Sequence, residues 1–390
     1  MIVQVRKTYK YRLYKNDNKD HHLHDQINIA GIIWNHIAAL QKRYYRIYGK
    51  HISENKMKKH IAKLRMKASK FAYWKKLGSQ AVQEICERHE KVYENFFKKQ
   101  GGLPRFKKVK KFRSFVLKQA GYKVLEHDYC KKYRVIKIGK KKYKFVYHRA
   151  MSDSAKVKTI SILRDSANRL WICFSVIENM NIHPELSTGK IGGFDFGLKT
   201  FLTTDEGQSV DMPEFYKEDM PRLKAIQSQV SRKSQRSKNN KYGKDHIARR
   251  HIRIADKRKD FHYQLAHDLC DQYDILVFED LNIQAMKKLW GRKISDLGFT
   301  QFMQILEWVA FKRGKRVIYI DRFERTTGKC SKCGHKQKLT LDERTFECQN
   351  CGLTLDRDHN AAINIRQSFL KTSPEAGHRL ILSQSIEDFA

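Results

Sequence analysis

Proline is scarce in this sequence, and long apolar runs are absent. The 390 residues include 5 prolines and 20 glycines, which argues against long disordered linkers. No apolar run reaches the roughly 18 residues that a transmembrane span needs, and the opening MIVQVRKTYKYRLYK lacks the apolar core of a signal peptide. We expect a folded intracellular protein that does not enter a membrane, with about two or three domains.

Acidic residues are also in short supply. The chain has 80 Lys and Arg against 41 Asp and Glu, a net charge of +39, and the first 150 residues carry +30 of it. A basic chain can simply be soluble or can bind an anionic membrane, but nucleic acid is the partner that we favour. Within the basic region, QKRYYRIYGK (residues 41–50) could stack on unpaired bases or form a partly buried tyrosine face.

Cysteines are too few for a disulfide scaffold. Four of the eight are isolated and are interpreted as ordinary reduced thiols: Cys86, Cys130, Cys173 and Cys270. The other four form two CxxC pairs separated by 14 residues, Cys330 with Cys333 and Cys348 with Cys351. This spacing predicts one structural Zn²⁺ in a four-cysteine ribbon, although paired thiols without metal are the alternative. Four thiolates leave no open coordination position, so this zinc would take no part in chemistry.

The N-terminal half mixes helical and strand patterns. Apolar residues recur at helical spacing from His22 to Leu40 and from Val82 to Phe96, which predicts a helical insert. Basic residues alternate with Tyr, Val, Ile and Phe in QVRKTYKYRLYK near the start and again from Lys131 to His148. That alternation is typical of a half-exposed sheet with cations on one face. The segment Gly101 to Phe115 predicts a loop that leads into another basic strand.

From Lys190 onward, short apolar strands alternate with helices. The predicted strands are IGGFDFG, KTFLTTDEG, ILVFED and RVIYID. The segment from Pro221 to Cys270 predicts a long helical arm with a cationic face. A helical stripe of apolar residues before RVIYID is predicted to be core rather than a cofactor site; it consists of Phe302, Ile305, Leu306 and Val309. Residues 371–390 lack a strong pattern and are predicted to be a mobile tail.

Three carboxylates stand out against these apolar patterns. Asp195 and Glu279 end apolar strands, and Asp358 lies where LDRDHNAAINI begins a helical stretch. Each alone has an ordinary explanation: a strand-to-loop turn for the first two, and a helix N-cap for an Asp ahead of a helix. Together, carboxylates from two strands and a helix can hold two divalent cations roughly 4 Å apart, as phosphodiester hydrolysis requires, and hard oxygen ligands suit Mg²⁺.

The motifs occur in a specific order: GGFDFGLKTFLTTDEG, ILVFEDLNIQAM, the two CxxC pairs and LDRDHNAAINI, with KYRLYKN and LPRFKK more loosely upstream. This order resembles the TnpB (OrfB) proteins of bacterial insertion sequences, relatives of the type V CRISPR effectors and of eukaryotic Fanzor proteins. The resemblance runs from Lys190 to Arg366. Phe196 and Leu355 depart from the usual residues of the motifs without removing a ligand.

The resemblance implies an activity. A guide RNA would direct the protein to double-stranded DNA beside a short flanking motif, and the DNA would be cleaved at a RuvC-like site. Asp195, Glu279 and Asp358 would be the catalytic residues and the ligands of two Mg²⁺, with Asp356 outside the set.

The resemblance also implies an α+β multidomain fold. An N-terminal wedge-like β-barrel (residues 1–20 and 101–185) would be interrupted by a helical recognition insert (21–100). A C-terminal RuvC-like RNase H fold of α/β type (186–327 and 354–370) would carry an inserted zinc ribbon (328–353). We expect a monomer for each RNA, in the cytoplasm and associated with the nucleoid.

Two other functions stay open at this point. A guided DNA-binding regulator without cleavage would have lost members of the carboxylate set, which this sequence retains. An unguided resolvase or transposase of the same fold would need no RNA, whereas the charge of the first 150 residues exceeds what a short DNA motif requires.

Overall fold

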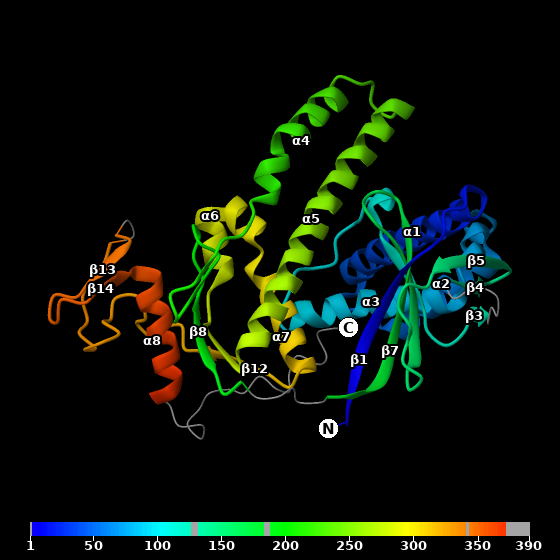
Figure 1. The fold of residues 1–390 in the computed structure, drawn as a ribbon. Helices are drawn as coiled ribbons and strands as arrows, with labels where there is room; N and C mark the ends of the chain where they lie inside the picture. Colours follow the sequence, from blue (N-terminus) through cyan, green and yellow to red (C-terminus); the bar gives the residue numbers. More distant parts are fainter. Residues whose placement is uncertain (1, 126–131, 183–187, 341–342, 372–390) are drawn as a thin grey trace. The chain divides into compact units, whose positions relative to one another are not determined.

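A computed structural model describes residues 2–125, 132–182, 188–340 and 343–371. The chain folds into two compact units, with residues 4–180 in the N-terminal unit and the C-terminal unit starting at residue 181 (Figure 1). The predicted tail beyond Lys371 and the isolated Cys130 lie outside the described residues. No helix in the described ranges is long and apolar enough to span a membrane.

Four helical segments form one part of the N-terminal unit. They are α1 (Asp17–Tyr48), α2 (Glu54–Lys67), η1 (Ser69–Lys76) and α3 (Ser79–Phe97). The two helices predicted from apolar spacing are confirmed as α1 and α3, and the stripe of α1 is buried in the core of the unit. α1 begins at Asp17, within the segment that we assigned to the barrel. In the tyrosine-rich end of α1, Tyr45 and Tyr48 are exposed, whereas Tyr44 packs against the core.

The strands of the N-terminal unit make two antiparallel sheets. The first has the order β1-β7-β6-β2, from β1 (Ile2–Arg12), β7 (Leu170–Asn181), β6 (Lys156–Arg164) and β2 (Ser114–Leu117). The second contains β3 (Tyr122–Leu125), β4 (Tyr133–Ile138) and β5 (Lys141–Val146). A single bridge between Leu13 and Phe145 links β5 to the chain just after β1. Both basic segments predicted as strands are therefore confirmed.

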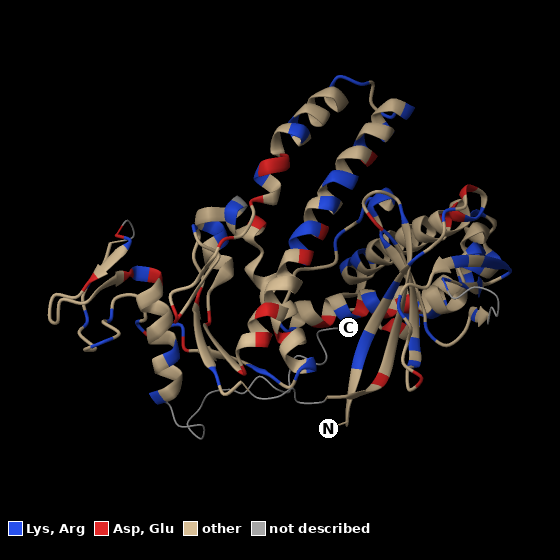
Figure 2. Cartoon of the chain, in the orientation of Figure 1, with Lys and Arg blue, Asp and Glu red and all other residues tan. Residues whose placement is uncertain are grey.

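One face of the second sheet carries a row of cations. Lys123, Lys137 and Lys142 lie directly opposite one another across β3, β4 and β5, and all three are exposed. We call these three residues the lysine row; Figure 2 shows Lys and Arg crowding these strands. Neighbouring strands are only about 4.8 Å apart, so like charges directly opposite one another destabilise the sheet. This face is therefore suited to a polyanion.

The C-terminal unit is built on a mixed sheet of order β10-β9-β8-β11-β12. Its strands are β8 (Ile191–Asp195), β9 (Leu202–Thr204), β10 (Ser209–Val210), β11 (Ile275–Glu279) and β12 (Arg316–Ile320). β8, β11 and β12 are parallel, whereas β9 and β10 pair antiparallel. The four strands predicted from the sequence are confirmed.

Helices cover both faces of this sheet (Figure 1). α5 (Lys238–Gln272) and α7 (Phe299–Lys312) contribute to the large apolar core on one face, and α8 (Arg357–Lys371) packs on the other. The predicted apolar stripe of α7 is buried, as expected for core. α6 (Ile283–Leu297) connects β11 to α7.

The predicted helical arm consists of two helices. α5 covers the second half of the segment, and a separate helix, α4 (Phe215–Ser231), covers the first half. The helical structure is interrupted at residues 232–237, where the chain reverses direction. As a result Gly243 packs against Val230, and a Cβ on Gly243 would come within 2.3 Å of Cγ2 of Val230. The polar composition of residues 232–237 hid this break from the analysis of apolar spacing.

α8 lies unusually close to β8. A Cβ on Gly193 would come within 2.3 Å of the carbonyl oxygen of Ala362, which only glycine avoids. Ala361, Ala362 and Ile365 are fully buried at this contact. Gly193 thus sets the spacing between the strand that carries Asp195 and the helix that carries Asp358.

Candidate functional site

Asp195 and Glu279 end adjacent parallel strands. In the register of β8 with β11, Phe194 lies opposite Phe278, so Asp195 and Glu279 are the next residues on the two strands. Carboxyl ends of parallel strands meet at one edge of the sheet, and the strands are about 4.8 Å apart. Both residues are half-buried at this edge.

Asp358 reaches the same edge from the first turn of α8. A Cβ on Gly197, two residues after Asp195, would lie 3.5 Å from Asp358 Oδ2. Two arginines are near this carboxylate, with Arg357 Nε at 3.3 Å and Arg344 Nη1 at 3.8 Å. The structure therefore brings Asp358 close to the loop that follows the first strand carboxylate.

Asp356 has a different role from Asp358. Its Oδ1 accepts hydrogen bonds from the backbone N–H of Asp358 at 2.9 Å and of His359 at 3.1 Å. Asp356 thus caps the start of α8, which is the ordinary explanation that the sequence allowed for an Asp ahead of a helix. Asp358 is the residue of this pair whose charge acts on Asp195.

Negative charge is concentrated around Asp195. Burial raises the pKa of Asp195 well above its usual value, and the negative charges of Asp358 and Glu279 raise it further, while Arg357 opposes them. Burial also raises the pKa of Glu279, with Asp280 adding to the shift and a hydrogen bond from Thr326 opposing it. An excess of negative charge on hard oxygen donors fits divalent cations such as Mg²⁺.

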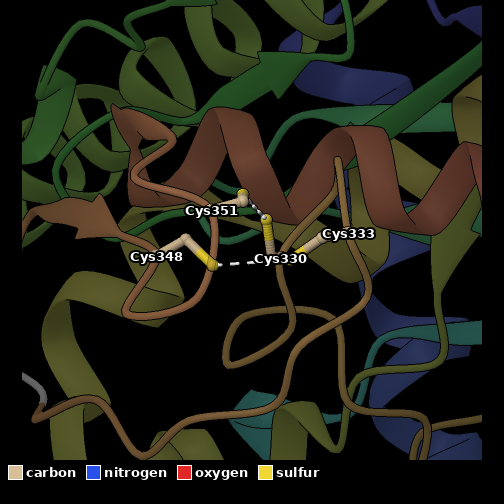
Figure 3. Close-up of side chains that lie close together, drawn as sticks. All are labelled: Cys330, Cys333, Cys348 and Cys351. Atoms are coloured by element: carbon tan, nitrogen blue, oxygen red, sulfur yellow. Dashed lines mark hydrogen bonds between the residues drawn. The ribbon is translucent and has the colours of Figure 1, made fainter.

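The four predicted zinc ligands converge in space (Figure 3). The sulfurs of Cys330, Cys333, Cys348 and Cys351 all lie within 4.8 Å of one another, and the pairs 330–351 and 333–348 are 3.6 Å apart. Four thiolates at about 2.3 Å from one Zn²⁺ have sulfurs roughly 3.8 Å apart, whereas a disulfide needs about 2.05 Å. This cluster could bind zinc. The three carboxylates form no cluster as tight as this one among the described residues.

The two halves of the cysteine cluster share one backbone pattern. Gly334 N–H donates to the carbonyl of Cys330 at 2.9 Å, and Gly352 N–H donates to Cys348 at 3.0 Å. Both glycines have left-handed φ angles, +75° and +69°, which favour glycine after each CxxC turn. Hydrogen bonds from the backbone of His335 and the side chain of Asn350 lower the pKa of the Cys333 thiol, which favours the thiolate that binds metal, whereas burial and hydrogen bonds to the other sulfurs raise the pKa of Cys351.

The first cysteine turn is fastened to α8 by residues that the sequence analysis missed. Asn360 exchanges hydrogen bonds with Lys329 and Ser331 at 2.8 and 3.0 Å, and Asn364 Nδ2 donates to the carbonyl of Lys329 at 2.7 Å. Both asparagines are buried. Their i, i+4 spacing on one face of α8 was the available signal. The cysteine cluster therefore braces the helix that carries Asp358.

The two departures from the usual motif residues serve packing. The Phe196 ring is partly buried and packs against the core of the C-terminal unit, 5.3 Å from the ring of Phe278 and 4.8 Å from that of Phe299. Leu355 lies in β14 (Thr354–Asp356) opposite the buried Phe346 of β13 (Thr345–Glu347). Neither residue displaces a carboxylate.

Two family models match the chain. Residues 174–289 match the OrfB_IS605 family, described as "Probable transposase", and residues 299–365 match the "Cas12f1-like, TNB domain". The first match contains Asp195 and Glu279, and the second contains the four cysteines and Asp358.

Several curated relatives extend these matches. The chain is 28% identical over 377 residues to a "Putative RNA-guided DNA endonuclease" of Streptomyces pristinaespiralis, covering 96% of this chain and 92% of that protein. It is 25% identical to InsQ of Escherichia coli K12, of the same description, covering 92% and 90%. It is 30% identical to the TnpB-like protein L79 of Acanthamoeba polyphaga mimivirus, over 55% of this chain and 44% of that protein.

Solved structures show the class of fold. The Cas12f1–sgRNA–target DNA complex matches with a TM-score of 0.53 at 14% identity, covering 93% of this chain and 99% of that one. The RNA-guided endonuclease Cas_phi3 also matches with a TM-score of 0.53, at 10% identity, covering 97% and 93%. The fold is thus the mixed α/β fold of the Cas12f1-like proteins. Within that class, the chain is similar in sequence to the OrfB_IS605 family over residues 174–289 and to TnpB-like proteins.

Proposed function

We propose that this protein is an RNA-guided DNA endonuclease that cleaves double-stranded DNA next to a short flanking motif. The observation that carries this proposal is the meeting of Asp195, Glu279 and Asp358 at one sheet edge, from three elements far apart in the sequence. The relatives with similar full-length sequences bear the name of RNA-guided DNA endonucleases. A protein with this activity would act in the cytoplasm, where it would associate with the nucleoid.

Asp195, Glu279 and Asp358 would hold the catalytic cations, and they are the residues that we assign to catalysis. Two Mg²⁺ held there would activate the attacking water and stabilise the leaving oxygen. The protein's own contribution is positional: the β8–β11 register sets the first two carboxylates, and the Gly193 contact sets α8 and with it Asp358. The mixed sheet with α8 on one face supports the RuvC-like RNase H fold that the resemblance implies.

The N-terminal unit would hold the nucleic acids. Its lysine row offers three aligned cations, and Tyr14 packs edge-on against Tyr133 at 5.8 Å, with Lys144 Nζ 5.2 Å from the Tyr133 ring centroid. Aligned cations beside aromatic rings suit a folded RNA that presents both phosphates and unpaired bases. Guide pairing would then read the DNA sequence, while the protein reads mostly shape.

The domain assignment remains part of this proposal. The wedge-like barrel would comprise residues 1–20 and 101–185 around a recognition insert at 21–100, except that the insert would begin with α1 at Asp17. The nuclease domain would comprise 186–327 and 354–370 around the zinc ribbon at 328–353. One protein chain would act with each guide RNA.

The test is cleavage of a plasmid by protein purified with its native flanking locus. We expect cutting that depends on Mg²⁺, on the co-purified RNA and on a plasmid sequence that matches this RNA. Nuclease-stripped protein and the Asp195→Ala variant serve as matched controls, and both should leave the plasmid intact. Sequence-specific cutting by the RNA-free protein would replace this proposal with a resolvase or transposase. Specific binding without cutting by the intact protein would indicate a guided regulator.

A further inference from the structure

Phe323 is the most exposed large apolar side chain among the described residues. It is 86% exposed and lies in the turn after β12, with the exposed arginines Arg322 and Arg325 on either side. Single exposed apolar residues are common on protein surfaces and alone mean little. What distinguishes Phe323 is where the turn lies and how it is held.

The turn of residues 321–326 begins at the edge of the sheet where β8 ends at Asp195 and β11 ends at Glu279. Ile320 ends β12 directly opposite Glu279 of β11, so Phe323 follows three residues beyond that level. Arg322 Nε bonds Asp280 Oδ2 at 3.2 Å, and Thr326 hydrogen-bonds Glu279 itself. The turn is thereby tied to the strand that carries the second carboxylate.

The same turn is tied to the helix that carries the third carboxylate. Asn364 Nδ2 donates to the carbonyl of Thr326 at 2.8 Å, and the Ser368 hydroxyl bonds Glu324. Within the turn, Phe323 N–H donates to Asp321 Oδ1 at 2.8 Å. The backbone of Phe323 is therefore fixed between two carboxylate-bearing elements while its ring stays in solvent. Asn364 and Asp358 are six residues apart on α8, about 9 Å along the helix axis.

We propose that Phe323 stacks on an unpaired base of the nucleic acid strand that lies across the carboxylates, with Arg325 on its phosphate backbone. This inference rests on the proposed function and adds a positioning residue to it. A carboxylate centre repels the strand that it must cut, so the strand needs attachment beside it. An aromatic ring flanked by cations provides that attachment without sequence preference, because every base has a stacking face.

Tryptophan in place of Phe323 would report the stacking directly. In the cleavage-deficient Asp195→Ala protein, Phe323→Trp should add fluorescence that a single-stranded oligothymidine quenches and an abasic strand of equal length does not. The fluorescence of the native tryptophans is measured in the Asp195→Ala protein without Phe323→Trp and is subtracted. Raised salt weakens binding to the other basic surfaces of the chain. RNA and DNA strands are tested in parallel, and quenching by either supports the proposal. Absent quenching with both, or equal quenching by the abasic strand, would overturn it.

Cleavage provides the second measurement. With the guide bound, Phe323→Ala should lower the cleavage rate about tenfold while target affinity is unchanged, because stacking seats a strand that guide pairing already holds. Leu289→Ala, which removes an exposed apolar side chain of α6 in the same unit, is the matched control and should cleave like the unaltered protein. Unaltered cleavage in Phe323→Ala would refute the stacking role and leave the nuclease standing. A protein that never cleaves would refute the nuclease, and the fluorescence result would still decide the stacking.

Discussion

The two candidate metal sites of the C-terminal unit are assembled by opposite routes. The four cysteines come from residues 330–351, and two local turns of the same pattern bring their sulfurs together. The three carboxylates come from residues 195–358 and meet only when the sheet and α8 are in place. The cysteine site depends on local backbone turns, whereas the carboxylate site depends on the fold of the whole unit and places like charges together against their repulsion.

Removing single carboxylates should have the largest effect. Asp195→Ala, Glu279→Ala and Asp358→Ala should each lower cleavage by on the order of 10³-fold, because each removes a proposed cation ligand, while target binding persists. Without Mg²⁺, Asp195→Ala should also raise the melting temperature, since it removes a buried carboxylate that its neighbours repel. Plasmid cleavage and thermal unfolding measure the two effects. Asp268→Ala, an exposed acid of α5, should change neither. Retained cleavage in Asp195→Ala would contradict the assignment.

Removing single cysteines should have the opposite effect on stability. Cys333→Ser or Cys348→Ser should lower zinc from about one per chain to near zero and unfold the ribbon locally, because metal binding and folding are coupled. Elemental analysis gives the zinc content, and limited proteolysis reports cuts within residues 329–353. Cys173→Ser, which changes a half-buried isolated thiol, should keep the zinc. A zinc-free ribbon that resists protease would show that thiol packing alone holds it.

The close packing of β8 against α8 can be tested by adding a single Cβ atom at Gly193. Gly193→Ala should destabilise the protein by about 1–3 kcal/mol, because its Cβ would meet the α8 backbone and nothing flexible can move aside. Gly291→Ala, whose Cβ would meet nothing within 4 Å beside the kink of α6 at Trp290, should change stability by less than about 0.5 kcal/mol. Urea denaturation compares the two variants. Equal stability of both would mean that α8 does not approach β8 this closely.

The smallest effect is expected at the helix cap. Asp356→Ala should cost about 1 kcal/mol of stability, because two backbone N–H groups of α8 lose their acceptor. Cleavage should fall far less than in Asp358→Ala. Thermal unfolding and cleavage assays of the two variants separate a cap from a ligand. A loss of cleavage equal to that of Asp358→Ala would move Asp356 into the metal site.

Elements with a strong period could be predicted from the sequence. The stripe of α7 and the basic strands β4 and β5 follow from their apolar spacing, and the convergence of the cysteines follows from the CxxC pattern. The pattern that predicts each of these elements lies in residues close together in the sequence, so the prediction does not require knowledge of long-range contacts.

Features that depend on contacts distant in the sequence could not be predicted. The break between α4 and α5 lies in a polar stretch with no apolar period, and the role of Gly193 depends on Ala362 from another element. Asn360 and Asn364 resemble ordinary polar residues of a helix until the cysteine turn is placed against them. For the carboxylates, the sequence indicated which residues to consider. That they lie close together is known only from the β8–β11 register and from the approach of Asp358 to Gly197.

Because of the lysine row, the stability of the folded protein should depend on whether a polyanion is bound to it. Three aligned cations repel one another in the bare chain, and a polyanion that binds only the folded chain both relieves the repulsion and stabilises the fold by mass action. Chains that have found RNA should therefore outlast bare chains under proteolysis. If the polyanion is the guide RNA that we propose, the amount of protein in a cell would then follow the supply of that RNA.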